Sequence, residues 1–255
     1  MSSPLVRTQD LAGGYRPGVD AISEVSFSAQ PGGVIAVLGP NGGGKSTLFR
    51  ALLGELPLRR GTVELAGRAA YVPQTERARL DFPVGALDVA LMGAYGRTPW
   101  FRRIARADRA AATAALERVG LAELARERFG ALSGGQRQRV LIARALVQDA
   151  PVMLLDEPLS GVDAVSAARI ETLFAELRDE GRALLVATHD VRQARAWDAV
   201  LCLHGRQLAF GPPDATLTPE VLQATYGAEL VVLAGGETAI AVDHHDHGHG
   251  HGHEH

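Results

Sequence analysis

Three uninterrupted apolar runs mark the strands of a buried sheet. They cover residues 34–38, 152–155 and 183–187, and each is bounded by glycine, proline or polar residues. Runs of this length without polar positions are typical of strands covered on both faces. Between residues 163 and 179, apolar residues recur at i, i+3, i+4 and i+7, which predicts a helix packed on the sheet and ended by Gly181. This alternation of strand and helix indicates an α/β fold.

Other parts of the chain follow different patterns. Polar and apolar residues alternate at 5–8, 22–28 and 62–65, which predicts short antiparallel strands. Residues 84–147 are helix-rich, and residues 108–119 form the clearest helix by propensity. Together the patterns predict an α/β domain with a mixed core sheet, an antiparallel β subdomain and an inserted helical subdomain.

Composition and charge narrow the functional classes. The 255 residues are 46% hydrophobic and 22% charged, and the formal net charge of −3 gives no field that favours nucleic acid. The single cysteine, Cys202, lies in an apolar run, so a disulfide framework is excluded and burial is expected. The sequence has neither a signal-peptide apolar region nor the ~18 consecutive apolar residues of a membrane-spanning helix. We therefore expect a cytoplasmic protein without a nucleic acid partner, and any link to a membrane must come through another subunit.

A glycine-rich stretch follows the first apolar run and leads into a predicted helix. Its residues are Gly39, Pro40, Asn41, Gly42, Gly43, Gly44, Lys45, Ser46 and Thr47. The spacing Gly-x4-Gly-Lys-Ser is that of a Walker A loop, in which backbone N–H groups and a helix N-terminus bind phosphate oxygens. Lys45 would reach the β- and γ-phosphates of a nucleoside triphosphate, and Ser46 a magnesium ion. A glycine-rich turn without a ligand is the alternative.

Polar residues that follow the predicted strands supply the other groups that phosphoryl transfer needs. Asp156 fits a carboxylate that helps hold magnesium, and Glu157 fits a general base for the attacking water. His189 could donate to the γ-phosphate, and Gln74 could coordinate magnesium or orient the water. Each has a structural alternative, because acids at strand ends often cap helices or face solvent, and a lone histidine is often only a hydrogen-bonding residue.

A second helix N-terminus able to bind an anion is predicted near residue 133. The residues there are Ser133, Gly134, Gly135 and Gln136, and they introduce a helix expected at residues 136–147. An ordinary capped helix is the alternative for this segment.

These motifs, in this order over residues 4–230, resemble the ATP-binding subunit of ABC transporters. The resemblance implies ATP and Mg²⁺ as cofactors and a homodimer in the ATP-bound state. In that dimer, ATP would lie between the Walker A loop of one subunit and residues 133–136 of the other. Asp163 matches the D-loop of the family, and Tyr15 matches the aromatic residue that stacks on adenine. The resemblance also implies integral membrane permease subunits as partners, with the chain peripheral on the inner face of the cell membrane.

Departures from common family forms point to a branch. Gly161-Val162 stands where many members have Ala-Leu, and Gly43 stands where Ala or Ser is usual. Residues 81–103 resemble manganese/zinc-type metal importers, which implies a divalent transition metal as cargo and, indirectly, an extracytoplasmic metal-binding protein. Three alternatives stay open: a soluble ABC ATPase of DNA repair or translation, an importer of another substrate, and a module that binds ATP without hydrolysis. Soluble ABC ATPases usually carry a coiled-coil insertion or a second set of motifs, and this sequence has neither. The presence of Glu157 and His189 disfavours a module that binds ATP without hydrolysis.

A basic cluster lies within the helix-rich region. It comprises Arg97, Arg102, Arg103, Arg106 and Arg109. A solvated face is the simplest interpretation of such a cluster. A docking surface for a membrane subunit comes next, and a nucleic acid patch comes last.

The end of the chain has its own chemistry. Residues 231–242 form a C-terminal extension, and a low-complexity tail at 243–255 is expected to be disordered without metal. Its histidines are His244, His245, His247, His249, His251, His253 and His255. Imidazoles spaced by glycine suit transition metals better than manganese, so the tail favours zinc over manganese as cargo and suggests a metal buffer or sensor. An affinity tag is the alternative, although such tags are usually unbroken histidine runs and no run here exceeds two.

Overall fold

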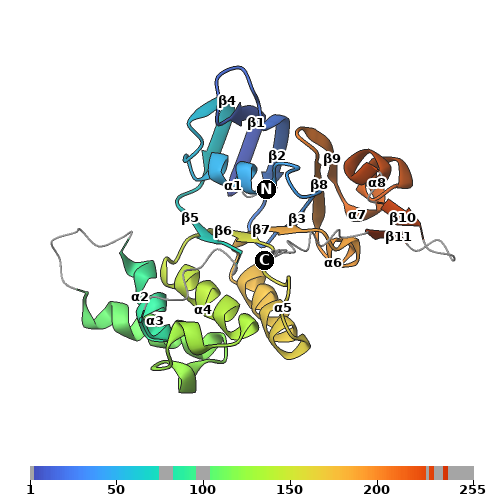
Figure 1. Ribbon diagram of the computed structural model, residues 1–255. Coiled ribbons are helices and arrows are strands. Elements are labelled where there is room, and N and C mark those ends of the chain that lie inside the picture. Colours follow the sequence, from blue (N-terminus) through green and yellow to red (C-terminus); the bar gives the residue numbers. More distant parts are fainter. Residues whose placement is uncertain (1–2, 75–82, 96–103, 228–229, 233–237, 241–255) are drawn as a thin grey trace, which may run out of the picture.

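The computed structural model describes residues 3–74, 83–95, 104–227, 230–232 and 238–240. Its centre is a six-stranded sheet in the order β5-β6-β7-β3-β8-β9 (Figure 1). The strands are β3 (Val34–Leu38), β5 (Ala69–Val72), β6 (Val152–Asp156), β7 (Ala183–Thr188), β8 (Ala199–Leu203) and β9 (Gln207–Gly211). The first five strands in the sheet run parallel, and β9 returns antiparallel to β8. The sheet is therefore mixed, and three of its central strands are the apolar runs of the sequence.

A second, antiparallel sheet covers one face of this core. It has the order β2-β1-β4, with β1 at Val6–Gly14, β2 at Ile22–Ala29 and β4 at Leu58–Leu65. Helix α1 (Lys45–Leu52) lies between the two sheets, because Leu48 and Phe49 share one buried cluster with residues of both.

Helices cover the other face of the core sheet. They include α2 (Ala86–Leu91), α3 (Arg106–Arg118), α4 (Gly134–Val147) and α5 (Ala164–Asp179), with short 3₁₀ turns η2 (Met92–Ala94), η3 (Ala122–Leu124) and η4 (Phe129–Ala131). The period of two along β6 separates the layers: Met153 and Leu155 pack with these helices, whereas Leu154 packs on the α1 side. The α1 and α4 helices consequently lie on opposite faces of the sheet (Figure 1).

Three helices of the C-terminal part pack against β8 and its neighbours β3 and β9: α6 (Val191–Arg195), α7 (Pro213–Thr216) and α8 (Pro219–Tyr226). The antiparallel strand pair β10 (Leu230–Val232) and β11 (Thr238–Ile240) follows α8. Cys202 is fully buried here, as its apolar run predicts, and burial raises the pKa of its thiol to about 11. None of the helices in the described ranges is long and apolar enough to cross a membrane.

Two helices begin two residues earlier than the sequence predicts, and the first of them, α3, begins at Arg106 rather than at residue 108. Helix α4 begins at Gly134 rather than at Gln136. The Ser133 hydroxyl accepts a hydrogen bond from the Gln136 backbone N–H at 3.2 Å, and the Gln136 side chain accepts one from the Ser133 N–H at 2.9 Å. This capping box draws both glycines into the first helical turn despite their low helix propensity.

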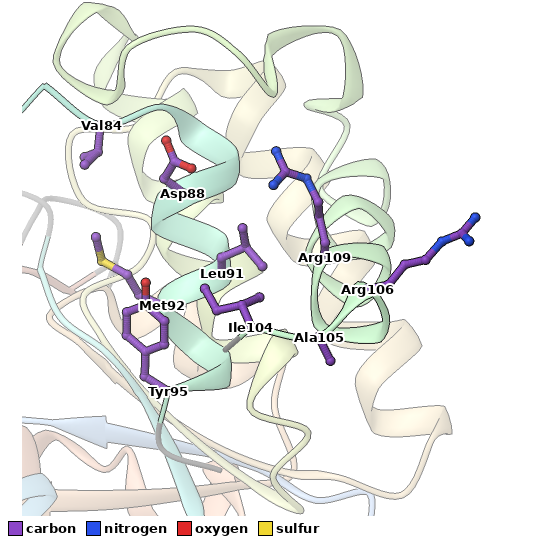
Figure 2. A pocket seen from close by; sticks show the side chains of 9 residues that line it. All are labelled: Val84, Asp88, Leu91, Met92, Tyr95, Ile104, Ala105, Arg106 and Arg109. Carbon is purple, nitrogen blue, oxygen red and sulfur yellow. The ribbon is translucent and has the colours of Figure 1, made fainter. Parts of the chain in front are cut away.

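The surface of the helical region contains a groove of about 570 Å³ between α2 and the start of α3 (Figure 2). Three exposed apolar side chains, Met92, Tyr95 and Ile104, line it. Arg106 and Arg109, both exposed, line its α3 side. The groove therefore combines apolar contact area with the positive charges of Arg106 and Arg109 on its α3 side and the negative charge of Asp88 on its α2 side.

Candidate functional site

Close packing makes glycine necessary at several positions of the loop between β3 and α1. A Cβ atom at Gly39 would lie 2.3 Å from the backbone oxygen of Leu203, and one at Gly43 would lie 2.9 Å from Cδ of Pro40. Gly44, which precedes the first residue of α1, has a φ of +104°, and a Cβ there would meet Ile22 at 2.6 Å. The loop thus passes so close to its neighbours that side chains are excluded at these positions, while its tip at Asn41 and Gly42 is exposed.

The loop lysine is almost completely buried and is held by oxygen atoms. Lys45 is 6% exposed, and its Nζ donates to the backbone oxygens of Gly39 at 2.7 Å and Pro40 at 3.2 Å. The same Nζ lies 3.6 Å from Oε1 of Glu157, which is an ion-pair distance. These contacts hold the ammonium group across the loop, where its charge can act on phosphate oxygens.

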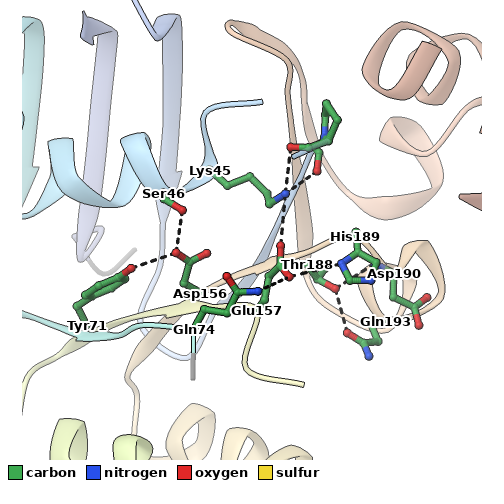
Figure 3. A network of polar contacts seen from close by, with 12 residues as sticks. Lys45, Ser46, Tyr71, Gln74, Asp156, Glu157, Thr188, His189, Asp190 and Gln193 are labelled. Carbon is green, nitrogen blue, oxygen red and sulfur yellow. Dashed lines mark hydrogen bonds and ion pairs between the residues drawn. The ribbon is translucent and has the colours of Figure 1, made fainter. Parts of the chain in front are cut away.

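Oxygen ligands suitable for magnesium gather beside this loop. Oγ of Ser46 donates to Oδ2 of Asp156 at 2.8 Å, and the Tyr71 hydroxyl donates to the same atom at 3.0 Å (Figure 3). Asp156 is only 3% exposed at the end of β6. A hydroxyl and a carboxylate are hard oxygen ligands of the kind that Mg²⁺ binds together with phosphate. The donor set therefore fits the metal that the sequence predicts.

Glu157 lies at the centre of a charged network (Figure 3). Its backbone adopts a left-handed conformation, with φ of +49°, which is uncommon outside glycine and is often found at functional sites. Oε2 accepts from Nε2 of Gln74 at 3.3 Å and lies 3.7 Å from Nδ1 of His189. The His189 contact is longer than an ordinary hydrogen bond, so we describe it as an ion pair when the imidazole is protonated.

The network perturbs both titrating partners. The neighbouring His189 imidazole, followed by the Lys45 ammonium, lowers the pKa of Glu157 against the opposing effect of burial. Conversely, Glu157 raises the pKa of His189 against the opposing effect of burial. Glu157 is therefore ionised at neutral pH, as a proton acceptor must be.

A small cavity adjoins these two residues. It has a volume of about 200 Å³ and is lined by residues 157–161, residues 187–190 and Gln193. His189 is 39% exposed in the structure, so its imidazole is reachable from this side.

Tyr15 lies beside the N-terminal part of α1. Its hydroxyl is 3.4 Å from Oγ1 of Thr47, and the Arg50 guanidinium carbon lies 5.6 Å from the ring centroid. That distance allows a cation–π contact that helps to fix the ring. Tyr15 is 47% exposed, which is compatible with the predicted stacking on adenine.

The second predicted group of site residues is assembled elsewhere. A Cβ at Gly135 would lie 2.5 Å from Oδ2 of Asp163, so the first turn of α4 packs directly against the Asp163 segment. Asp163 in turn caps α5 by accepting from the Ser166 N–H at 2.9 Å, and this hydrogen bond lowers the pKa of its carboxyl. Residues 133–136 and Asp163 therefore form one unit, on the face of the core sheet opposite to α1.

Two residues that contact the site were not predicted from the sequence. Tyr71 contacts Asp156, and Arg50 contacts Tyr15, although neither belongs to a recognised motif. Several predicted residues lie outside the described ranges: Arg97, Arg102, Arg103, His244, His245, His247, His249, His251, His253 and His255. Within the described ranges, no cluster of three or more His, Cys, Asp or Glu residues is placed to hold a metal ion.

Comparison with known proteins decides the family. A family model described as "ABC transporter" matches residues 22–160. The chain belongs to the ABC transporter family. The manganese transport system ATP-binding protein MntB of Bacillus subtilis (strain 168) is 43% identical over 221 residues, which cover 83% of this chain and 88% of that protein. The zinc transport system ATP-binding protein TroB of Treponema pallidum (strain Nichols) is 41% identical over 234 residues, which cover 88% of each chain.

Solved structures of ABC proteins agree with the fold. A provisionally assigned metal-chelate type ABC transporter in an inward-facing conformation superposes with a TM-score of 0.80 at 32% identity, covering 88% of this chain and 89% of that one. The cbiO1 protein of Clostridium perfringens, part of the complex cbiONQ, gives a TM-score of 0.73 at 26% identity, covering 88% and 94%. The predicted fold class is confirmed, and so is the prediction that this ABC chain is an ATPase.

Proposed function

We propose that this ABC ATPase powers a membrane transporter that imports a divalent transition metal, with zinc favoured over manganese. The observation that carries the metal assignment is the identity of 41–43% to ATP-binding proteins named for manganese and zinc transport. The preference for zinc rests on the seven histidines of residues 244–255. In this proposal, residues 4–230 form the ATP-binding domain, residues 84–147 its helical subdomain and residues 243–255 a metal-binding tail.

The network around Glu157 supports a hydrolytic mechanism. Water attacks the γ-phosphorus and the bond to the β-phosphate oxygen breaks, so that ADP leaves. The Glu157 carboxylate accepts the proton of this water, and Gln74, which donates to the carboxylate, would orient both. Lys45 and His189, which both lie beside the Glu157 carboxylate, would supply positive charge and hydrogen-bond donors to the γ-phosphate oxygens. Ser46 and Asp156 would hold Mg²⁺, which neutralises charge on the β- and γ-phosphates when it is bound.

Dimer formation follows from the separation of the two site groups. The Walker A side and the unit of residues 133–136 with Asp163 lie on opposite faces of the core sheet, so we infer that each ATP is shared between two chains. The proposed dimer is peripheral at the inner face of the cell membrane. An extracytoplasmic metal-binding protein would contribute only indirectly, through the permeases.

We assign the groove between α2 and α3 to a permease segment. Met92, Tyr95 and Ile104 offer apolar contact. The two charges of Arg106 and Arg109 outweigh the single carboxylate of Asp88, so the groove favours an acidic residue in the partner segment (Figure 2). This arrangement supports the docking interpretation of the basic cluster over a merely solvated face.

Metal uptake tests the proposal. Cells that lack this chain are to be compared with cells that carry the wild type or the Glu157→Gln variant, using radioactive zinc and manganese. We expect zinc uptake to fall without the chain, and only the wild type to restore it. A loss confined to manganese would remove the zinc preference, and unchanged uptake of both metals would remove the metal-importer assignment.

A further inference from the structure

Tyr71 lies at a junction of three elements of the nucleotide site (Figure 3). It is the third residue of β5, the edge strand that pairs with β6. Two residues beyond Val72, the last residue of this strand, the chain reaches Gln74, whose amide contacts Glu157. Tyr71 is thus joined by a short backbone segment to the groups around Glu157.

Packing fixes the ring of Tyr71 beneath α1. Its ring meets that of Phe49 in an edge-to-face arrangement, with centroids 6.3 Å apart and planes at 70°. Phe49 is fully buried in the cluster between the two sheets. The ring therefore has a defined position, and its hydroxyl is directed by packing.

The hydroxyl shares its acceptor with a predicted metal ligand. Oδ2 of Asp156 accepts from Tyr71 at 3.0 Å and from Ser46 at 2.8 Å. The two donors come from β5 and α1, so Asp156 of β6 is held from two directions. At 3% exposure, Asp156 has little access to water that could replace either donor.

We propose that Tyr71 is a positioning residue for the metal-binding carboxylate of Asp156. By holding Oδ2, the phenol restricts rotation of the carboxylate and pre-orients it for Mg²⁺ in the complex with ATP. Because Tyr71 also belongs to the strand that leads to Gln74, a displacement of that strand changes the metal carboxylate and the Glu157 network together. This inference rests on the proposed magnesium–ATP site.

The Tyr71→Phe variant tests this role, because it keeps the ring against Phe49 and removes only the hydroxyl. The affinity of the full chain for a non-hydrolysable ATP analogue is measured by calorimetry in Mg²⁺ and in EDTA. We expect wild-type affinity in EDTA and a roughly tenfold smaller gain from Mg²⁺, the lower end of the effect seen when a hydrogen-bond partner of a metal ligand is lost. The Mg²⁺ concentration for half-maximal ATPase activity should rise by about the same factor, while kcat at saturating Mg²⁺ changes less.

Tyr226→Phe is the matched control, since it removes a phenol hydroxyl from helix α8, in the C-terminal part of the chain. Its Mg²⁺-dependent gain should equal that of the wild type. An unchanged gain in Tyr71→Phe would overturn the positioning role, and weaker binding in EDTA would assign Tyr71 to packing alone. If the wild type itself gains no affinity from Mg²⁺, the proposed magnesium site fails together with the inference.

Discussion

At the residue scale, Glu157 is held by side chains from three separate segments, and its substitution is the sharpest test of the chemistry. Glu157→Gln keeps the size of the side chain but removes the proton acceptor. We expect ATP to bind while hydrolysis slows by at least ~10²-fold, as is typical when a general base is lost. Phosphate release and size-exclusion chromatography in ATP check this, with ATP-bound dimers expected to accumulate. Unchanged turnover in the purified transporter would mean that Glu157 is not the base.

The Glu157–His189 pair also predicts a pH dependence of stability. The pKa of His189 in the folded state is raised above its ordinary value of 6.5. The contribution of His189 to the free energy of unfolding is therefore complete below pH 6.5 and is lost as the pH rises through the folded-state pKa. The folded-state pKa of Glu157 is lowered below 4.5, so its contribution is present above pH 4.5 and is lost as the pH falls through the folded pKa. The ion pair therefore stabilises the folded protein most between pH 4.5 and pH 6.5, the ordinary pKa values of the two side chains.

The measurement compares thermal unfolding of the wild type and His189→Gln near pH 5.5 and near pH 8.5. We expect the difference in melting temperature to be larger at the lower pH, and modest because solvent screens the partly exposed His189. His204→Gln, in the exposed turn between β8 and β9, is the control and should show no such trend. A difference that grows toward pH 8.5 would contradict the assigned ion pair.

Sequence patterns can identify site residues only where spacing reflects chemistry. The glycine-lysine-serine spacing and the paired acids after an apolar run each indicate a chemical requirement, so Lys45, Ser46, Asp156 and Glu157 were predictable. Tyr71 was not, because a tyrosine in a short strand looks the same whether its hydroxyl meets solvent or a carboxylate. That direction is decided by packing against Phe49, which comes from another element.

At the element scale, the two glycines that open α4 have different environments. A Cβ at Gly135 would lie 2.6 Å from Oγ and 2.8 Å from Cβ of Ser166, and the latter atom is fixed to the α5 backbone. A Cβ at Gly134 would find its nearest neighbour, the backbone oxygen of Gly161, at 3.8 Å. One glycine is therefore required by packing between α4 and α5, and the other is not.

Alanine substitution separates these two cases. We expect Gly135→Ala to lower the free energy of unfolding by about 1–3 kcal/mol, because the overpacked methyl group forces α4 and α5 apart. Gly134→Ala should leave it unchanged or raise it by up to ~1 kcal/mol, because alanine favours a helix over glycine. Urea unfolding of both variants gives the comparison. Equal stability of the two would show that α4 can shift on α5 without cost.

Element types were more predictable than their boundaries. Uninterrupted apolar runs predicted β3, β6 and β7, because a strand that is buried on both faces has apolar residues at nearly every position. The start of α4 was misplaced by two residues, since low glycine propensity argues for a loop and only the reciprocal bonds of Ser133 and Gln136 outweigh it. Sheet order, which brings Gln74, Glu157 and His189 together, depends on long-range pairing that local patterns do not encode.

At the scale of the whole molecule, the proposed head-to-tail dimer predicts complementation between two inactive variants. Lys45→Ala removes the Walker A ammonium, and Ser133→Arg places a bulky cation at the start of α4; each alone should lack ATPase activity. In a mixed dimer, the intact Lys45 of one chain meets the intact Ser133 of the other. An equal mixture should recover about a quarter of wild-type activity, because half of random dimers are mixed and each has one of two sites intact.

Titration of one variant into the other, with phosphate release as the readout, provides the check. Activity should peak near equal proportions and vanish at both extremes. Absence of recovery at every ratio would contradict the shared site, whereas activity in Ser133→Arg alone would show that residue 133 is not needed at the nucleotide.

The histidine tail at residues 243–255 is expected to account for most of the zinc bound by the whole chain. Seven imidazoles and two carboxylates among residues 244–255 offer interchangeable ligand sets, so deleting residues 243–255 should remove several zinc equivalents and leave basal ATPase activity intact. Zinc binding should weaken below about pH 6, where the imidazoles protonate. A variant with all seven tail histidines replaced by asparagine keeps Asp246, Glu254 and the glycine spacing, so it separates imidazole from carboxylate binding. Equal zinc binding by the full-length and truncated chains in equilibrium dialysis would remove both the tail's assigned role and the zinc preference drawn from it.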